Sequence, residues 1–471
     1  MGESIENYQS EERSRWKYLC PLSVGKSRNA GLGTGRAKVR GSVFVAVSTG
    51  RRDAGMRLLG LEIKRVLKTK LTWILMCIAI VLSVLLAYLP VTFEGGREVD
   101  SDGNIVGTEL HGMNAVKYYR THSNVQGEVT LEILEETVRT YQEVYSEYDS
   151  AYGEEVPSEV YYEKLRAYSP FVRGIKEAFS DRKSGMAPAI GDVSVDQVKN
   201  FYLMLNDRLS SIMDMEQKNY PSAKTIALQK FSKVQTPYKY YYGASSDSMD
   251  YQTIYIFLLA ILCAVIVAPI FSTEYQTGAD DIIRCTKNGR KKLAVAKIVS
   301  ACLITGILYL VCGIVWIVVT NSLFGWEGTK TSMQVIFSAT SLLPYNIGQL
   351  QWANMLGGFL LFLSTICFTL FLSACAKNNV SALAMALVFV LLPLIAYMAI
   401  PGQPGEWIQV LLPGAGIGLS NSFLYGMLNF DFLHLGSASF WNTDAMLVLA
   451  LVKIPLFIML AILIYDYRKR L

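Results

Sequence analysis

The strongest constraint on the fold is a set of six apolar segments, each long enough to cross a membrane as an α-helix. A helix needs about 20 mostly apolar residues to span the roughly 30 Å of a bilayer's hydrocarbon core. The segments lie at residues 71–92, 251–272, 293–320, 352–376, 380–400 and 444–466. Charged residues make up 18% of the chain, whereas soluble proteins carry about 25%. The sequence therefore predicts an all-α polytopic membrane protein with six transmembrane helices.

Basic residues are distributed unevenly between the two sides of these segments. The short connections on one side carry Lys330, in residues 321–351, and no basic residue in 401–443. The flanks and connections on the other side carry Arg57, Lys64, Arg65, Lys68, Lys70, Arg284, Lys287, Arg290, Lys291, Lys292, Lys297, Lys377, Arg468, Lys469 and Arg470. Because short loops rich in Lys and Arg stay in the cytoplasm, we expect a plasma-membrane protein with both termini cytoplasmic.

The first 70 residues divide into two parts. Residues 1–55 are polar, basic and glycine-rich, which favours a disordered or non-native extension, with Met56 as an alternative start. The string GKS at 25–27 lacks the preceding glycine of a phosphate loop. Residues 56–70 predict a cytoplasmic elbow helix that lies in the membrane interface; a basic flank of the next segment is the other interpretation.

Two connections on the outer side are long enough to have structure of their own. Residues 93–250 are predicted to form a mostly helical extracellular domain, because apolar residues recur at helical spacing from Leu131 through Leu134 and Val138 to Tyr141 and Tyr145. Residues 401–443 are apolar but broken by Gly and Pro. They predict a re-entrant or interfacial segment.

The sequence offers little support for catalysis, metal binding or nucleic-acid binding. The eight cysteines lie mostly in apolar runs without a CxxC pair, so no zinc or redox site is expected. His111 and His122 are too far apart for a helical metal pair. The net charge of +5 is modest. We expect no catalytic residue, no metal site and no cofactor bound by this chain.

A dense group of charges lies between the second and third apolar segments, in residues 273–292. Gly278 and Gly289 permit tight bends, and ADDIIRCTK predicts a short helix with Ile282 and Ile283 on one side. A solvated loop whose charges only set the topology is the simpler interpretation.

The stretch FSTEYQTGADDIIRCTKNGRKKLAVAK resembles the corresponding cytoplasmic loop of ABC-2 type permeases, and LEIKRVLKTKLTWIL resembles their elbow helix and first span. In that family an aromatic residue, Glu, Gly, a short helix, Ser or Thr, a basic residue and a Lys recur. The matching residues are Phe271, Glu274, Gly278, Thr286, Arg290 and Lys297. The resemblance covers Met56 to the C-terminus, although the outer domain agrees in topology alone.

The resemblance implies a transmembrane permease subunit of an ATP-binding cassette exporter. Its cytoplasmic loop would act as a coupling helix on a separate ATPase subunit, which binds ATP and Mg and drives alternating access. It also implies a homodimer or heterodimer of permeases, embedded in membrane lipids. The pair Asp280–Asp281 departs from the family pattern. The alternative is a ligand-sensing or force-transmitting membrane protein without transport.

Lys453 is a second candidate residue, because it lies inside the sixth apolar segment. A charge at that depth is costly and is a functional hypothesis by default. It would face the translocation pathway or pair with an acidic group such as Asp444. Extension of its side chain to the outer interface is the other interpretation.

Overall fold

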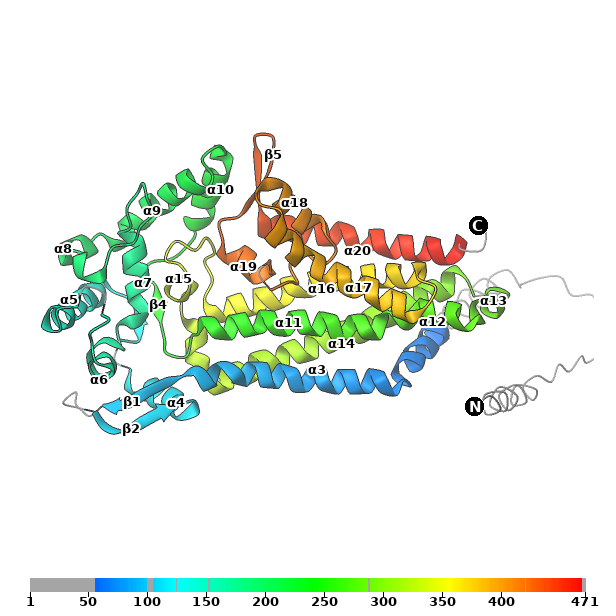
Figure 1. Ribbon diagram of the computed structural model, residues 1–471, viewed down its shortest axis with the longest axis horizontal. Helices are drawn as coiled ribbons and strands as arrows, with labels where there is room; N and C mark the ends of the chain where they lie inside the picture. The colour runs from blue at the N-terminus through cyan, green and yellow to red at the C-terminus, as the bar shows by residue number, and fades with distance from the viewer. Residues whose placement is uncertain are drawn as a thin grey trace, which may run out of the picture. The chain divides into compact units, whose positions relative to one another are not determined.

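The computed structural model describes residues 56–99, 105–123, 125–150, 153–286, 289–419 and 421–467. The expected extension at 1–55 lies outside these residues. In the described part, six helical segments are long and apolar enough to cross a membrane, which confirms the predicted number (Figure 1). They are α3 (Lys70–Tyr88) with η1 (Leu89–Phe93), α11 (Ser246–Val267) with α12 (Pro269–Thr277), α14 (Lys291–Phe324), α16 (Ile347–Cys375), α17 (Asn379–Ala399) and α20 (Asn442–Tyr467).

Helix α16 lies at the centre of the bundle and packs against α11, α14, α17 and α20. Two thirds of its most apolar stretch is buried (67%), whereas the corresponding share of α20 is 17%. The outward faces of α3, α17 and α20 expose large apolar side chains such as Trp73, Met398 and Leu451. Because soluble monomers rarely leave large apolar faces uncovered, these faces suit contact with lipid.

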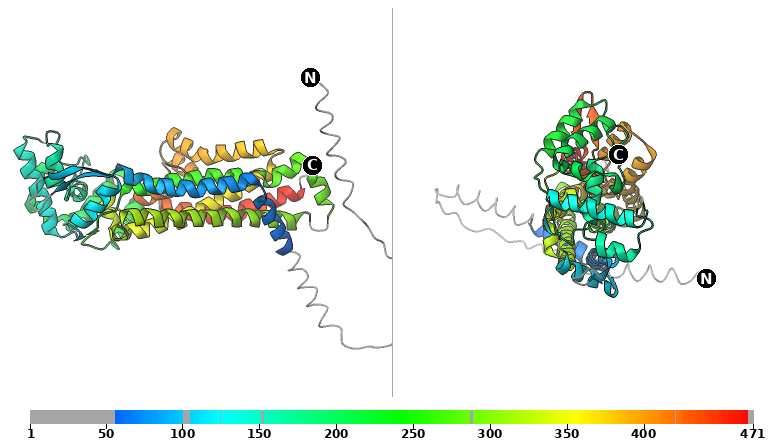
Figure 2. Two further views of the ribbon diagram at one scale, coloured as in Figure 1. Left: turned by 90° about the horizontal axis from the view of Figure 1, so that it is seen from below. Right: turned by 90° about the vertical axis from the view of Figure 1, so that its left-hand side faces the viewer.

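Residues 56–67 form a separate helix before the first span. The helix ends at a break at residues 68–69, and α3 then starts in a new direction (Figure 2). The indole N–H of Trp73 spans this break and donates a hydrogen bond to the Leu67 carbonyl at 2.7 Å. Glu62 and Val66 are buried, whereas Lys64 is exposed. The helix therefore turns one face, with a carboxylate on it, toward the bundle.

Residues 94–245, called the inter-span domain below, supply most of a second core, with residues such as Leu134, Phe171 and Leu209, and Val335 and Trp441 of later segments complete it. The domain is mostly helical, as predicted. Its helices are α4 (Met113–His122), α5 (Leu131–Glu147), α6 (Ser158–Val160), η2 (Tyr161–Leu165), α7 (Ser169–Ala178), η3 (Ile190–Asp192), α8 (Val195–Val198), α9 (Phe201–Glu216) and α10 (Pro221–Phe231).

The description of the fold as all-α needs a correction, because the described residues contain three antiparallel two-stranded sheets. They pair β1 (Gly95–Val99) with β2 (Ile105–His111), β3 (Gly127–Glu128) with β4 (Lys239–Tyr240), and β5 (Phe432–Leu435) with β6 (Ala438–Trp441). These strands have two to seven residues. Strands this short give too few alternations to stand out from loop sequence.

The segment 401–443 contains two short helices and the β5–β6 hairpin. The helices are α18 (Gln403–Leu411) and α19 (Phe423–Leu428). The hairpin binds the inter-span domain, since Gln217 donates to the Phe430 carbonyl at 3.1 Å and Ser222 to the Ser437 carbonyl at 2.9 Å. Directly after the hairpin, Lys230 pairs with Asp444 at 2.9 Å. The start of α20 is thereby fixed to the inter-span domain.

The inter-span domain is joined to the connection between α14 and α16 by hydrogen bonds such as that from the Tyr238 hydroxyl to the Ala339 carbonyl at 2.7 Å, and above all by the carboxylate of Glu177. That connection contains η4 (Trp326–Lys330) and α15 (Met333–Ile336). Glu177 of α7 accepts hydrogen bonds from Ser338 Oγ at 2.5 Å, Ala339 N at 2.8 Å and Thr340 Oγ1 at 2.6 Å. The Thr340 amide donates to it as well, at 3.3 Å. Four donors on three consecutive residues therefore converge on one side chain.

Candidate functional site

The candidate site is built around a break in the second span. Pro269 has no N–H and ends α11, and the neighbouring backbone groups find a partner in Ser373 of α16. The Ser373 hydroxyl donates to the Ala268 carbonyl at 2.6 Å and accepts from the amides of Phe271 at 3.0 Å and Ser272 at 3.3 Å. The break is therefore a fixed bend, because α16 satisfies its backbone groups.

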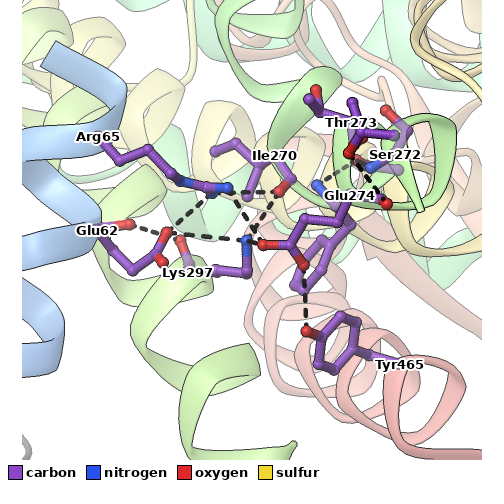
Figure 3. A network of polar contacts seen from close by, with 12 residues as sticks. Glu62, Arg65, Ile270, Ser272, Thr273, Glu274, Lys297 and Tyr465 are labelled. Atoms are coloured by element: carbon purple, nitrogen blue, oxygen red, sulfur yellow. Dashed lines mark hydrogen bonds and ion pairs between the residues drawn. The ribbon is translucent and has the colours of Figure 1, made fainter. Parts of the chain in front are cut away.

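Next to the bend lies a group of four charges, called the four-charge cluster below: the buried Glu62, Glu274 and Lys297 and the partly exposed Arg65 (Figure 3). Lys297 Nζ lies 2.5 Å from Glu274 and 3.8 Å from Glu62. Arg65 lies 2.8 Å from Glu62 and 3.3 Å from Glu274. Two carboxylates and two cations leave the cluster without net charge, as a buried ionic group requires.

Backbone and aromatic groups complete the surroundings of the cluster. Arg65 and Lys297 both donate to the Ile270 carbonyl, at 3.2 and 3.1 Å. Tyr465 near the end of α20 donates to Glu274 at 3.2 Å. The Phe271 ring lies 5.6 Å from the Lys297 ammonium and 5.2 Å from the Tyr465 ring. The cluster thus connects helix 56–67 with α12, α14 and α20.

The structure divides the residues that match the family pattern into a buried and an exposed set. Phe271, Glu274 and Lys297 have 0%, 5% and 0% of their surface exposed, so their contacts are within the chain. Asp280 is also buried. Asp281, Thr286 and Arg290 are exposed. These three residues lie on or just after α13 (Ala279–Arg284).

The predicted loop at 273–292 begins later than expected, because α12 continues to Thr277 and ends at Gly278. Gly278 has φ of 69°, the left-handed conformation that glycine adopts without strain. Gly289 is needed for a different reason, since a Cβ there would lie 1.7 Å from the Ile283 carbonyl oxygen. The two glycines therefore set the start of α13 and the turn that follows it.

Ile282 and Ile283 do not share one side of α13, contrary to the prediction. Successive residues of a helix point about 100° apart. Ile283 packs against the main core of the bundle, while 75% of Ile282 is exposed. Ile282 is therefore an uncovered apolar side chain, next to exposed residues such as Asp281 and Thr286.

Asn379, at the tight turn between α16 and α17, also binds this region. Its carboxamide oxygen accepts from Ser272 Oγ at 2.7 Å and Thr273 Oγ1 at 3.0 Å, and its backbone N–H donates to Gln276 Oε1 at 3.2 Å. Sequence reasoning did not identify Glu62, Arg65 or Asn379. The spacing of Glu62 and Arg65, which places them on one helix face, was a usable signal.

Lys453 has a definite partner, the end of α18. Its ammonium donates to the carbonyls of Val410 at 2.6 Å and Leu412 at 2.8 Å. The side chain is buried, and Asp444 pairs with Lys230 instead. Lys453 therefore stabilises the negative C-terminal end of a helix. Its role in a translocation pathway stays a prediction.

Replacing Lys453 by methionine should lower the free energy of unfolding by on the order of 3 kcal/mol, since one buried and one partly buried carbonyl lose a charged donor. Hydrogen exchange of residues 403–412 should speed up, because the end of α18 loses its support. The exposed Lys64→Met variant is the matched control and should change neither quantity. Unchanged exchange in α18 of the Lys453→Met protein would contradict this role.

Comparison with known proteins supports the family that the sequence resembles. Residues 56–470 match the family described as ABC-2 family transporter protein. The match includes all six candidate spans, helix 56–67, the inter-span domain and α13. No curated protein sequence matches the chain. Because the matched range covers most of the 471 residues, the chain belongs to the ABC-2 family of transporter proteins and is a multi-pass ABC transporter permease.

Proposed function

We propose that the chain is the permease subunit of an ABC exporter whose ATP hydrolysis takes place on a separate ATPase subunit. Permeases of this family typically work with such a subunit. The observation that carries the proposal is the four-charge cluster. It joins the helical segment that leads into α13 to helix 56–67, α14 and α20. A force applied at α13 would therefore reach three other elements through short polar contacts.

The proposed docking surface consists of the exposed residues on α13 and the turn after it. The group contains Asp281, Ile282, Cys285, Thr286 and Arg290. Ile282 would fill an apolar pocket of the ATPase subunit, while the surrounding charges select the partner. Interfaces usually draw most of their binding energy from a few buried side chains at the centre, and Ile282 is the large apolar side chain of this group.

The residues that match the family pattern take two roles in this proposal. Asp281, Thr286 and Arg290 contact the ATPase subunit, whereas Phe271, Glu274 and Lys297 transmit its movement. Asp280 and Gly278 position α13. Two permease chains and two ATPase subunits would form the transporter, with ATP and Mg bound by the ATPase. The α13 end would face the cytoplasm and the inter-span domain the outside, as the distribution of basic residues favours. Closure of the ATPase pair would drive alternating access.

Replacing Ile282 by aspartate should weaken ATPase association at least tenfold, because it puts a charge into an apolar contact. Association is measured by co-purification of a tagged permease with the ATPase subunit encoded beside it. Leu435→Asp is the matched control. Leu435 is a similarly exposed apolar residue (68%), but it lies on β5, before the start of α20. This variant should leave co-purification unchanged.

Co-purification combined with a transport measurement separates docking of the ATPase subunit from transmission of its movement. The conservative Glu274→Gln variant should keep ATPase association while reducing transport in reconstituted vesicles, because Glu274 lies beneath the docking surface. The proposed function is wrong if no ATPase subunit co-purifies with the unmodified protein. A loss of association in Glu274→Gln with Ile282→Asp unaffected would refute the assignment of the two roles.

A further inference from the structure

A cleft of about 790 Å³ opens in the inter-span domain, away from the four-charge cluster. Its volume lies within the range of roughly 300–1,000 Å³ that is usual for small-molecule sites. The wall is rich in aromatic rings. They belong to Tyr118, Tyr119, Tyr162, Tyr240, Tyr242 and His122. Such a concentration of tyrosine rings is unusual for a solvated surface.

The charged groups of the cleft favour a cation over an anion. Glu94, Glu163 and Arg166 line it. Glu94 and Arg166 neutralise each other at 3.3 Å, and Tyr242 donates to Glu94 at 3.1 Å. The carboxylate of Glu163 is exposed, so these three side chains together carry one negative charge. Negative charge beside the electron-rich faces of aromatic rings attracts a positively charged ligand.

Two rings of the cleft already contact a cation of the chain itself. The Arg166 guanidinium carbon lies 4.9 Å from the centre of the Tyr119 ring and 6.0 Å from that of Tyr162. Both distances are within the range of a cation–π contact. Burial is the largest effect on the pKa of Tyr119, which it raises, so this ring remains uncharged at neutral pH.

The cleft lies where the domain joins the spans. Glu94 directly follows the first span, which ends at Phe93, and Gly243 and Ala244 come shortly before α11. Gly243 has φ of 100°, and a Cβ there would lie 2.5 Å from the Phe324 carbonyl oxygen at the end of α14. A ligand in the cleft would therefore contact both chain segments that connect the domain to the bundle.

We propose that this cleft binds an organic cation that carries an amine or guanidinium group. The tyrosine rings would cover the cation, and Glu163 would neutralise it. The end of the first span and the start of the second span would then contact the same ligand. The proposal does not depend on the ATPase subunit, so its failure is distinguishable from failure of the proposed permease function.

The test is a calorimetric titration of the purified full-length protein with agmatine, which carries both a guanidinium and an amine. Saturable binding is expected. Tyr162→Leu and Glu163→Gln should each weaken it by about fivefold or more, since each removes one part of the cation site. Glu163 is exposed, so its replacement leaves folding intact. Residues of the same domain outside the lining supply the matched controls: Tyr148→Leu, at a half-buried tyrosine, and Glu155→Gln, at an exposed glutamate, should retain the affinity of the unmodified protein.

A second titration with glutarate, an anion of similar length, tests the choice of charge. Glutarate should not compete with agmatine. The proposal is overturned if agmatine shows no saturable binding, if glutarate displaces it, or if Tyr162→Leu and Glu163→Gln bind agmatine as tightly as their controls do.

Discussion

Replacing Lys297 by methionine should destabilise the protein by about 3–5 kcal/mol, the usual result of removing one partner from a buried ion pair. Lys297 has no exposed side-chain surface and contacts two carboxylates, Glu274 and Glu62. Without it, Arg65 alone faces two buried negative charges. Thermal unfolding of the purified protein in detergent measures the loss. Transport in reconstituted vesicles should fall in parallel.

A double variant provides the control for this effect. Lys297→Met combined with Glu274→Gln leaves Glu62 paired with Arg65, so the buried charges balance again. The double variant should be more stable than the sum of the two single losses predicts, by about 0.5–3 kcal/mol. Strict additivity of the two losses would show that Lys297 and Glu274 act independently, contrary to their short contact.

Replacing Glu177 by alanine should cost on the order of 3 kcal/mol of stability. The hydroxyls of Ser338 and Thr340 can rotate toward other acceptors, but the amides of Ala339 and Thr340 have fixed directions and lose a charged acceptor. Unfolding followed by circular dichroism measures the change. Hydrogen exchange should also accelerate at residues 338–340, where the domain meets the connection between α14 and α16.

Two further variants make this prediction specific. Glu177→Gln keeps one carbonyl oxygen and should lose less stability than the alanine variant. Glu143→Ala removes an exposed carboxylate of α5 and should change stability by less than about 0.5 kcal/mol. Equal stability of the Glu177→Ala and Glu143→Ala proteins would mean that the four hydrogen bonds contribute little to holding the domain.

The spans could be predicted from the sequence because each one carries its signal locally, in about 20 consecutive apolar residues. The contacts around the site carry no such local signal. Glu274 meets Arg65 across 209 positions of the sequence, and helix periodicity says nothing about which distant face a residue meets. The resemblance to the family pointed to Phe271, Glu274 and Lys297, but it gave no indication that they are buried.

Lys453 shows another limit of sequence reasoning. Its depth in an apolar segment marked it as unusual, and an acidic side chain was the natural partner to consider. The actual partners are the main-chain carbonyls of Val410 and Leu412. Every residue has a carbonyl group, so such a partner leaves no trace in the amino-acid sequence. The short strands were missed for a related reason, since their pairing depends on turns and on backbone hydrogen bonds.

Helix α20 is held near both of its ends by residues that are distant in the sequence. Asp444 pairs with Lys230 of the inter-span domain, and Tyr465 donates to Glu274 at the bend of the second span. The 26 residues of α20 make it about 39 Å long at 1.5 Å per residue. Pro455 removes one hydrogen bond from α20, but the rest of the helix resists a change in its length, so α20 can act as a stiff rod. A displacement of α12 would reach the inter-span domain along this rod, and the two ends of the permease would move in step without touching each other.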